Sequence, residues 1–175
     1  MAPVLAGEAV LVRPWDAADA NALEPACGDP DIGRFTTIPA EFSHDAARAW
    51  IARQHNHERE GTALVLAIEP VAVGHAVGMV GPFLLKRSDG PRLGYWLTRQ
   101  HRGRGLATRA ALLLVNWALA QEEFAHVFVD VECGNLPSVR LAERLGAKPV
   151  GRRIEKLSDG RTVDLDRFVI ERATI

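Results

Sequence analysis

The sequence predicts an α/β protein in which helices pack on a mixed, mostly antiparallel sheet. Three strand-like runs follow one another in the middle of the chain, which is typical of an antiparallel meander. Further on, strand-like and helical runs alternate, which indicates crossover connections. An Asp-Gly pair at 159–160 between two strand-like stretches predicts a closing hairpin. The 175 residues match one ordinary domain, so we expect a single domain spanning residues 1–175.

The amino-terminal part begins with one strand and one helix. Residues 8–15 form a short β-branched run that ends in a proline and a tryptophan. The run 16–27 is typical of a helix, with Asp16 as its N-cap. Glycine and proline dominate from Gly28 to Pro39, and we expect a loop there.

A second helix and the meander follow this loop. Residues 43–60 begin with Ser43, a favoured N-cap, and Gly61 behind them is a good helix stop. Three strands are then predicted from β-branched runs separated by turn residues, at 62–70, 75–83 and 92–97.

The carboxy-terminal half alternates between helices and strands. A helix is expected from Leu106 because apolar residues recur on one face, at Leu106, Ala110, Leu113, Leu114 and Trp117. Residues 126–133 predict a strand. The run 137–148 predicts a short helix with a proline in its first turn and Gly146 as its stop.

The overall composition excludes several classes of protein. A net charge of −1 gives no general field that would recruit nucleic acid or an anionic membrane. The two cysteines, Cys27 and Cys133, lie far apart and indicate buried free thiols rather than a disulfide framework. The first residues carry no basic leader, and no apolar run is long enough to span a bilayer. We therefore expect a reduced, cytoplasmic compartment.

The segment 102–108 joins the third strand of the meander to the following helix and contains two glycines and two arginines. Amides at a helix N-terminus lack intrahelical acceptors, and the helix dipole adds positive potential there. Gly103 and Gly105 would let the backbone approach a pyrophosphate, with Arg102 and Arg104 beside it. Glycine can also serve such a turn for conformational reasons alone.

Two other phosphate-binding turns fit this segment less well. A P-loop needs a Gly-Lys pair followed by serine or threonine, and the sequence has none. A dinucleotide turn has a third glycine near the first strand, whereas Thr108 occupies that place and two helices precede the turn. Glu132 lies at a tolerable distance for the ribose contact, so a dinucleotide-binding oxidoreductase remains an alternative.

The string QHRGRGLAT, with Gln100, Gly103 and Gly105, resembles the acetyl-CoA signature Q/R-x-x-G-x-G/A of the GNAT superfamily of N-acetyltransferases. More narrowly, the chain is similar to the RimJ/RimL branch. The similarity lies in VLVRPWDAADANAL, GYWL, GNLPSVRLAERLGAK and DGRTVDLDRF, which occur in the family's order across nearly the whole chain. The resemblance implies a GNAT fold with six to seven strands, about four helices and splayed central strands.

The resemblance also implies the chemistry. An acetyl group would pass from acetyl-CoA directly to a primary amine in a ternary complex, without a metal. The amide-rich arm of the cofactor would lie between the strand ending at Leu97 and the strand 126–133, with the amide near Leu97 polarising the thioester. The residues implied to bind the cofactor are Leu97, Arg102, Gly103, Arg104, Gly105, Leu106, Ala107, Thr108, Asn135 and Ser138.

Asn135 and Ser138 match the family's Asn-x-x-Ser, which the resemblance places near the cofactor's sulfur. Ser138 shares a helical face with three apolar residues, so an inward hydroxyl could protonate the departing thiolate. Asn135 and Ser138 are therefore the candidate catalytic residues. Helix capping by the same two residues is the structural alternative.

The general base is not identified by the sequence. Arg92 stands where family members often carry an acidic residue, which leaves Asp130, Glu132, His75 and Glu155 as unranked candidates. An α-amine, with a pKa of about 7.7 to 8.0, needs less help from a base than a lysine side chain does. Tyr95, the single tyrosine, precedes the turn and does not occupy the usual place of a tyrosine acid.

Several questions about partners stay open at this level. The acceptor could be a protein N-terminus, an amino acid, an antibiotic or a polyamine, and a homodimer is compatible with the sequence. A catalytically silent acyl-CoA-binding module on the same fold is the main alternative to an enzyme. His55 and His57 are spaced i and i+2 on a helix, so they face different ways and do not predict a metal site.

Overall fold

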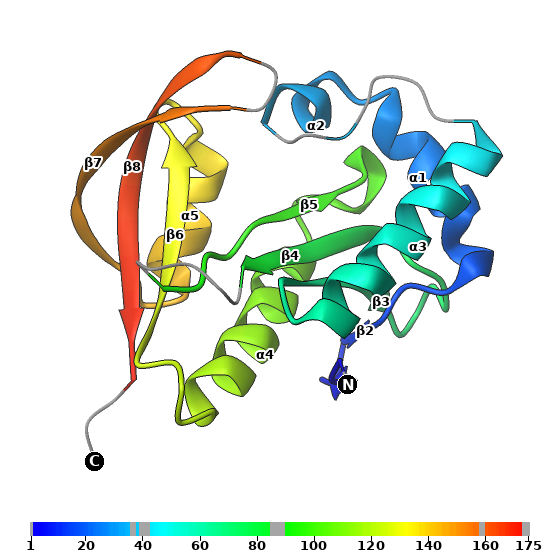
Figure 1. The fold of residues 1–175 in the computed structure, drawn as a ribbon, viewed down its shortest axis with the longest axis horizontal. Helices are drawn as coiled ribbons and strands as arrows, with labels where there is room; N and C mark the ends of the chain where they lie inside the picture. The colour runs from blue at the N-terminus through cyan, green and yellow to red at the C-terminus, as the bar shows by residue number, and fades with distance from the viewer. Residues whose placement is uncertain (1, 36–37, 39–42, 85–89, 158–159, 173–175) are drawn as a thin grey trace.

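The computed structural model describes residues 2–35, 38, 43–84, 90–157 and 160–172. In these residues the chain forms two antiparallel sheets with helices packed around them (Figure 1). The first sheet has the strand order β1-β2-β3-β4-β5, and its strands are Leu5–Ala6, Val10–Arg13, Ala63–Pro70, Gly78–Leu84 and Tyr95–Leu97. The second has the order β6-β8-β7, formed by His126–Glu132, Thr162–Glu171 and Lys148–Lys156.

Five α-helices lie in the described residues. They are α1 (Ala20–Cys27), α2 (Pro30–Phe35), α3 (His44–Glu60), α4 (Leu106–Ala120) and α5 (Leu136–Arg144). Short 3-10 turns at Ala17–Asp19 and Arg99–His101 precede α1 and the glycine turn. The helix starts follow the sequence closely: Ser43 caps α3 by accepting from the Ala46 amide, and Gly61 ends it in the left-handed conformation.

The central strand β3 is apolar along both faces because helices cover both. Leu64, Leu66 and Ile68 pack with α4 in one core cluster. Val65 and Ala67 pack on the other face, in a second cluster with residues of α1 and α3. A strand covered on both sides has no reason to alternate between apolar and polar residues.

The two sheets approach each other just before β5 and near the start of β6. Arg92 and Phe128 form an isolated parallel bridge, in which the Leu93 amide donates to the Phe128 carbonyl at 2.8 Å. Further along, β5 and β6 belong to different sheets, and their ribbons diverge in Figure 1. The predicted splayed strands are thus confirmed, and α5 lies beside the gap.

Two sequence predictions were wrong in detail. The stretch from Gly28 to Pro39 was expected to be a loop, but it contains α2. Asp29 accepts the Asp31 amide at 3.0 Å and Pro30 opens the helix, a favourable start that the glycine and proline content concealed. The buried face of α4 is also rotated: Ala111, Val115 and Ala118 are buried, while Leu113 and Trp117 lie at its half-buried edge.

Candidate active site

The glycine turn adopts the conformation that its sequence suggests. Gly103 and Gly105 have φ values of 75° and 73°, in the left-handed region that disfavours any side chain. A Cβ atom placed on either would meet nothing within 4 Å, so both face open space. The first helical bond of α4 runs from the Arg109 amide to the Gly105 carbonyl at 3.0 Å, which leaves the preceding amides without helical acceptors.

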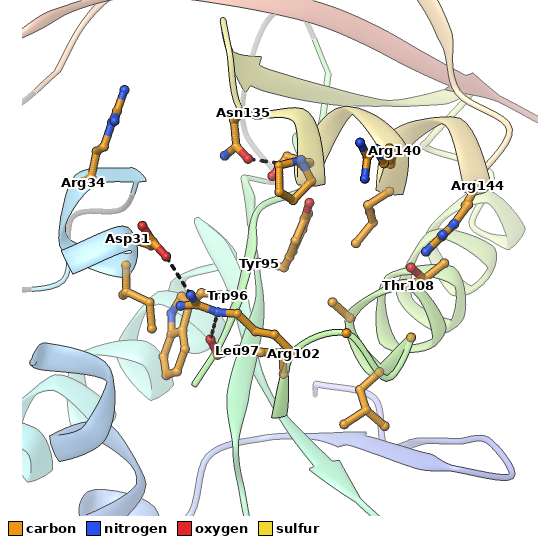
Figure 2. Close-up of a pocket in the computed structure, with 18 of the residues that line it drawn as sticks. Asp31, Arg34, Tyr95, Trp96, Leu97, Arg102, Thr108, Asn135, Arg140 and Arg144 are labelled. Atoms are coloured by element: carbon orange, nitrogen blue, oxygen red, sulfur yellow. Dashed lines mark hydrogen bonds and ion pairs between the residues drawn. The ribbon is translucent and has the colours of Figure 1, made fainter. Parts of the chain in front are cut away.

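A cavity of about 630 Å³ adjoins this turn. It is lined from the turn, the end of β5, α2 and α5 (Figure 2). Of the residues expected to bind the cofactor, all but Arg104 line it, and the exposed side chain of Arg104 lies outside. Arg140 and Arg144 on α5 line the same cavity and were missed at the sequence level, although their i, i+4 spacing could have suggested a shared face.

The side chain of Arg102 has a structural role that the sequence did not suggest. Its Nε donates to the Leu97 carbonyl at 2.9 Å, and one terminal nitrogen donates to Asp31 at 3.0 Å (Figure 2). The other terminal nitrogen donates to Asp29 at 2.7 Å. Arg102 therefore fastens the glycine turn to the end of β5 and to α2. Its guanidinium is already committed to carboxylates rather than free for a phosphate.

The exposed edge of β5 presents backbone donors to the gap between the sheets. The Thr98 amide donates to the Val77 carbonyl, and the Gly81 amide donates to the Gly94 carbonyl. These bonds and the strand register show which residues of β5 direct their amides towards β4. In an antiparallel ladder the intervening residues point their amides the other way. The amides of Tyr95 and Leu97 therefore face away from β4, towards the gap.

The start of α5 forms the opposite wall. Asn135 is the N-cap, and its side-chain oxygen accepts the Ser138 amide at 3.3 Å, so the capping role considered for this pair is present. The Ser138 side chain is half-buried and lines the cavity, on the same helical face as the buried Leu141 and Ala142. Capping and a catalytic position are thus compatible.

Tyr95 is a site residue that the sequence reading missed. Its side chain projects towards the start of α5 (Figure 2), and its hydroxyl is buried without a hydrogen-bond partner of ordinary geometry among the described residues. Burial raises the pKa of Tyr95, and the neighbouring Ser138 hydroxyl partly offsets this rise. The signal available in the sequence was a lone tyrosine one residue before the buried Trp96.

A second cavity, of about 690 Å³, lies on the other side of this wall. Tyr95, Trp96, Asn135 and Ser138 line both cavities, and Arg34 on α2 also reaches both. The remaining walls come from α3, the inner strands of the first sheet, and β6 and β8. Their residues are largely apolar, including Trp50, Val65 and Leu165.

The four candidate bases are placed very differently. Asp130 accepts from Arg167 at 2.7 Å and pairs with Arg92 at 3.2 Å, and Arg92 also holds Glu155 at 3.0 Å. His75 is exposed and lines neither cavity.

Glu132 lines the second cavity. Its ion pair with Arg34 is long, at 3.7 Å. Of the two carboxylates that line this cavity, Asp130 and Glu132, Glu132 is therefore held less tightly.

The thiols and the two helical histidines lie apart from these cavities. Cys27 and Cys133 line neither cavity, and burial raises the pKa of both thiols. Cys133 was expected to be buried, but it is half-buried. His55 contacts the Trp15 carbonyl and His57 contacts Thr62, so the two rings serve separate contacts.

A glycine turn at a helix N-terminus, an open strand edge beside it and two cavities with a common wall define a two-substrate transferase domain. The chain belongs to the acetyltransferase (GNAT) domain family, whose model matches residues 9–148. It is an N-acetyltransferase and not a dinucleotide-binding oxidoreductase. No helix in the described parts of the chain is long and apolar enough to cross a membrane.

Similar proteins extend over nearly the whole chain. The uncharacterized N-acetyltransferase p20 of Bacillus licheniformis is 26% identical over 164 residues, which cover 92% of each chain. The microcin C7 self-immunity acetyltransferase MccE, solved with acetyl-CoA and AMP, superposes with a TM-score of 0.82 at 17% identity, covering 94% of this chain and 93% of that one. RimL, a ribosomal-protein alpha-N-acetyltransferase solved with coenzyme A, gives a TM-score of 0.81 at 15% identity, covering 98% and 100%.

Proposed function

We propose that this protein transfers an acetyl group from acetyl-CoA to a primary amine by direct attack in a ternary complex. The observation that carries the proposal is the wall shared by the two cavities. A thioester held in the first cavity and an amine held in the second would meet at Tyr95 and Ser138. Because neither cysteine lines a cavity, the site offers no thiol for an acetylated intermediate.

The residues of the first cavity fit acetyl-CoA. The amides of the glycine turn would hold the pyrophosphate, and Arg140 and Arg144 would add positive charge beside it. The amides of Tyr95 and Leu97 would pair with the amide-rich arm, as an added strand pairs with a sheet edge. Acetyl-CoA supplies the activated acyl group, and the amide of Leu97 would stabilise the oxyanion that forms at its carbonyl.

The leaving thiolate needs a proton, and two hydroxyls converge where it would form. Ser138 could donate directly, and the buried Tyr95 phenol beside it is also protonated at neutral pH and could share the role. We therefore assign the role of acid to the Ser138 and Tyr95 pair. Asn135 would hold the helix start that positions Ser138.

Glu132 is the proposed base. Glu132 and Asp130 both line the second cavity, but Asp130 is held by Arg167 and Arg92, whereas the ion pair of Glu132 with Arg34 is long. Glu155 is held by Arg92 and does not line the cavity. General base catalysis contributes about 10²- to 10⁴-fold. For Glu132→Gln we expect a loss of about 100-fold in kcat/KM at neutral pH. The loss should shrink at higher pH, where more of the acceptor amine is already deprotonated.

We further propose the RimJ/RimL type of acceptor, a protein N-terminus or a related small amine. The motifs across the chain and the resemblance to RimL support this assignment. A single domain over residues 1–175 and a cytoplasmic location remain predictions, as does a homodimer.

The proposal is tested by following thiol release from acetyl-CoA across a panel of peptide N-termini, amino acids, aminoglycosides and polyamines. Release that depends on one class of amine, with the acetylated amine identified by mass spectrometry, would establish the reaction. Acetyl-CoA binding without turnover of any amine would support the silent-module alternative instead. Absence of binding would refute the assignment of the first cavity.

The acid assignment is tested with Ser138→Ala, Tyr95→Phe and the double variant. If the two hydroxyls act as a pair, the double variant should lose little more kcat than the worse single variant, because residues that act as a unit are not additive. Acetyl-CoA affinity should change little in Tyr95→Phe. Full activity in the double variant would exclude both hydroxyls as the acid.

A further inference from the structure

The second cavity has apolar walls that come from α3 and from both sheets. Trp50 lies on α3, Met79 and Trp96 lie on the first sheet, and Val163 lies on β8 of the second sheet. Building on the proposed transferase function, we propose that the acceptor carries a bulky apolar group beside its amine and an amide N–H that Gln54 binds. An apolar first residue of a peptide has both of these features.

The aromatic part of this wall is packed against neighbouring rings. The Trp50 ring meets the Trp15 ring edge-on, with ring centroids 5.3 Å apart, and the Trp15 ring lies tilted against Trp96 at 6.4 Å. Trp15 and Trp96 are buried, whereas Trp50 is half-buried and borders the cavity. A surface that is already packed loses little conformational entropy when an apolar group binds to it.

The charged residues that line the cavity do not oppose an apolar occupant. Glu132 pairs with Arg34 at 3.7 Å, and Asp130 pairs with two arginines that lie outside the cavity lining. Arg161 donates to the Arg34 carbonyl at 3.1 Å, and Arg53 is exposed on α3. These charges are therefore either engaged with other protein groups or solvated, and apolar contact is what the inner walls offer.

Gln54 is a buried polar side chain on the α3 side of the cavity. It is 9% exposed, and its Nε2 donates to the Trp50 carbonyl at 3.0 Å. Because a carbonyl accepts this bond, the orientation of the side-chain amide is fixed and Oε1 is left as an acceptor. Oε1 has no hydrogen-bond partner among the described residues. An N–H group on the acceptor would supply that partner.

These contacts define the acceptor from one end to the other. Its amine lies at the shared wall, where Tyr95, Ser138 and Glu132 all line the second cavity. The volume of about 690 Å³ lies in the range of sites for small molecules or a few residues of peptide. Polyamines and aminoglycosides lack a bulky apolar group and would leave the apolar walls without a matching contact. A small amino-acid amide and a peptide N-terminus both satisfy the chemistry.

The first test compares acceptors that differ only in the side chain beside the amine. Initial rates are measured with alaninamide, leucinamide and asparaginamide. The side chains of leucine and asparagine have nearly the same shape, so this pair separates apolarity from size. We expect kcat/KM to be about 30-fold higher for leucinamide than for alaninamide, because three more carbon atoms leave water. Asparaginamide should not exceed alaninamide.

The second test concerns the N–H group and the source of the acceptor. Leucine methyl ester keeps the side chain and the amine of leucinamide but has no amide N–H. We expect its kcat/KM to be about tenfold lower, because the buried acceptor of Gln54 is then left unpaired. The amidated peptide Leu-Gly-Gly identifies the source. A higher kcat/KM than for leucinamide indicates a protein N-terminus, and an equal value indicates a small amide.

Two variants connect these preferences to the cavity. Val163→Phe places a larger side chain in the cavity and should lower the preference for leucinamide over alaninamide about tenfold. Val169→Phe is the matched control, because Val169 is also half-buried on β8 but lines neither cavity. Gln54→Met should remove the preference for leucinamide over the methyl ester. Melting curves establish that each variant is folded.

Three results would overturn the inference: equal kcat/KM for leucinamide and alaninamide, a preference for asparaginamide over leucinamide, or an effect of Val163→Phe no larger than that of its control. Equal rates for amide and ester would refute the role of Gln54. If no amine is acetylated, the proposed function fails separately. Calorimetry with N-acetylleucinamide and N-acetylalaninamide in the presence of coenzyme A then decides. Tighter binding of the leucine compound supports the apolar acceptor site, and equal binding refutes it.

Discussion

Replacing Arg102 with methionine separates two roles that this side chain could play. In the structure its guanidinium binds the Leu97 carbonyl and both Asp29 and Asp31. The Asp29 side chain is 4% exposed and that of Arg102 is 32% exposed. Breaking a fully buried ion pair costs about 3–5 kcal/mol. Because Arg102 is partly solvated, we expect Arg102→Met to lower the free energy of unfolding by about 2 kcal/mol.

Thermal unfolding measures this loss directly. For a chain of this size about 1 kcal/mol corresponds to a shift in Tm of about 2–4 °C, so Arg102→Met should melt about 4–8 °C lower. Arg104→Met is the matched control from the same turn, since Arg104 is exposed and lines neither cavity, and its Tm should hardly change. A double-mutant cycle with Asp29→Asn should give a coupling of about 1–2 kcal/mol.

The result that would refute this reasoning is an unchanged Tm together with a large loss of acetyl-CoA affinity in Arg102→Met. That outcome would mean that the guanidinium leaves the carboxylates and serves the cofactor's phosphates. We expect instead that affinity falls because the turn is less well fixed. Adding acetyl-CoA should then recover part of the lost Tm by mass action.

Three further predictions concern the turn and the acidic limit of stability. Gly105→Ala should raise the Kd for acetyl-CoA about tenfold in calorimetry, because the φ of Gly105 is 73° and the new Cβ atom would face the cavity. The left-handed φ should also cost about 1–2 kcal/mol of folding free energy, which melting would show. The exposed control Gly28→Ala, where φ is negative, should show neither effect. Burial and the nearby Arg104 lower the pKa of His101 below 6.5. As pH drops below 6.5, the unfolded chain therefore binds this proton more readily than the folded chain, and stability should fall. Melting curves at pH 7.5 and 5.5 should show a smaller loss in His101→Asn than in the wild-type protein. Burial alone would raise the pKa of Asp19, but the hydrogen bond from Arg13 lowers it below 3.8. The contribution of Asp19 to stability is therefore fully present above pH 3.8 and is lost as pH falls further. Asp19→Asn should be less stable than the wild-type protein at pH 7 but should lose less stability on acid titration.

Local signals in the sequence predicted most of the fold. The caps at Ser43 and Asn135 and the stop at Gly61 depend on neighbouring residues only, and all are present in the structure. Asp16 caps the 3-10 turn Ala17–Asp19 that leads into α1, rather than α1 itself. The two glycines of the turn likewise require a backbone conformation that no other residue adopts easily. Helix α2 was missed because its start depends on one short Asp-Pro pair inside a glycine-rich stretch.

Features that depend on distant contacts were not predictable. The guanidinium of Arg102 is fixed by Asp29, which is 73 residues away, and Arg92 meets Glu155 across 63 residues. Tyr95 gains its place in the site only because α5 packs opposite it. Arg34 and Glu132 of the second cavity are on segments that come together only in the folded chain, so no local pattern marks their ion pair.

Two-substrate initial-rate kinetics test the central claim that both substrates meet at the wall between the two cavities. Rates are measured while acetyl-CoA and the acceptor amine are varied independently, with the intact protein analysed by mass spectrometry. The account predicts intersecting double-reciprocal lines and no acetylated protein intermediate. Parallel lines together with an isolable acetyl-enzyme would contradict it, because the acetyl group would then reach the amine through a covalent protein intermediate and not by direct attack.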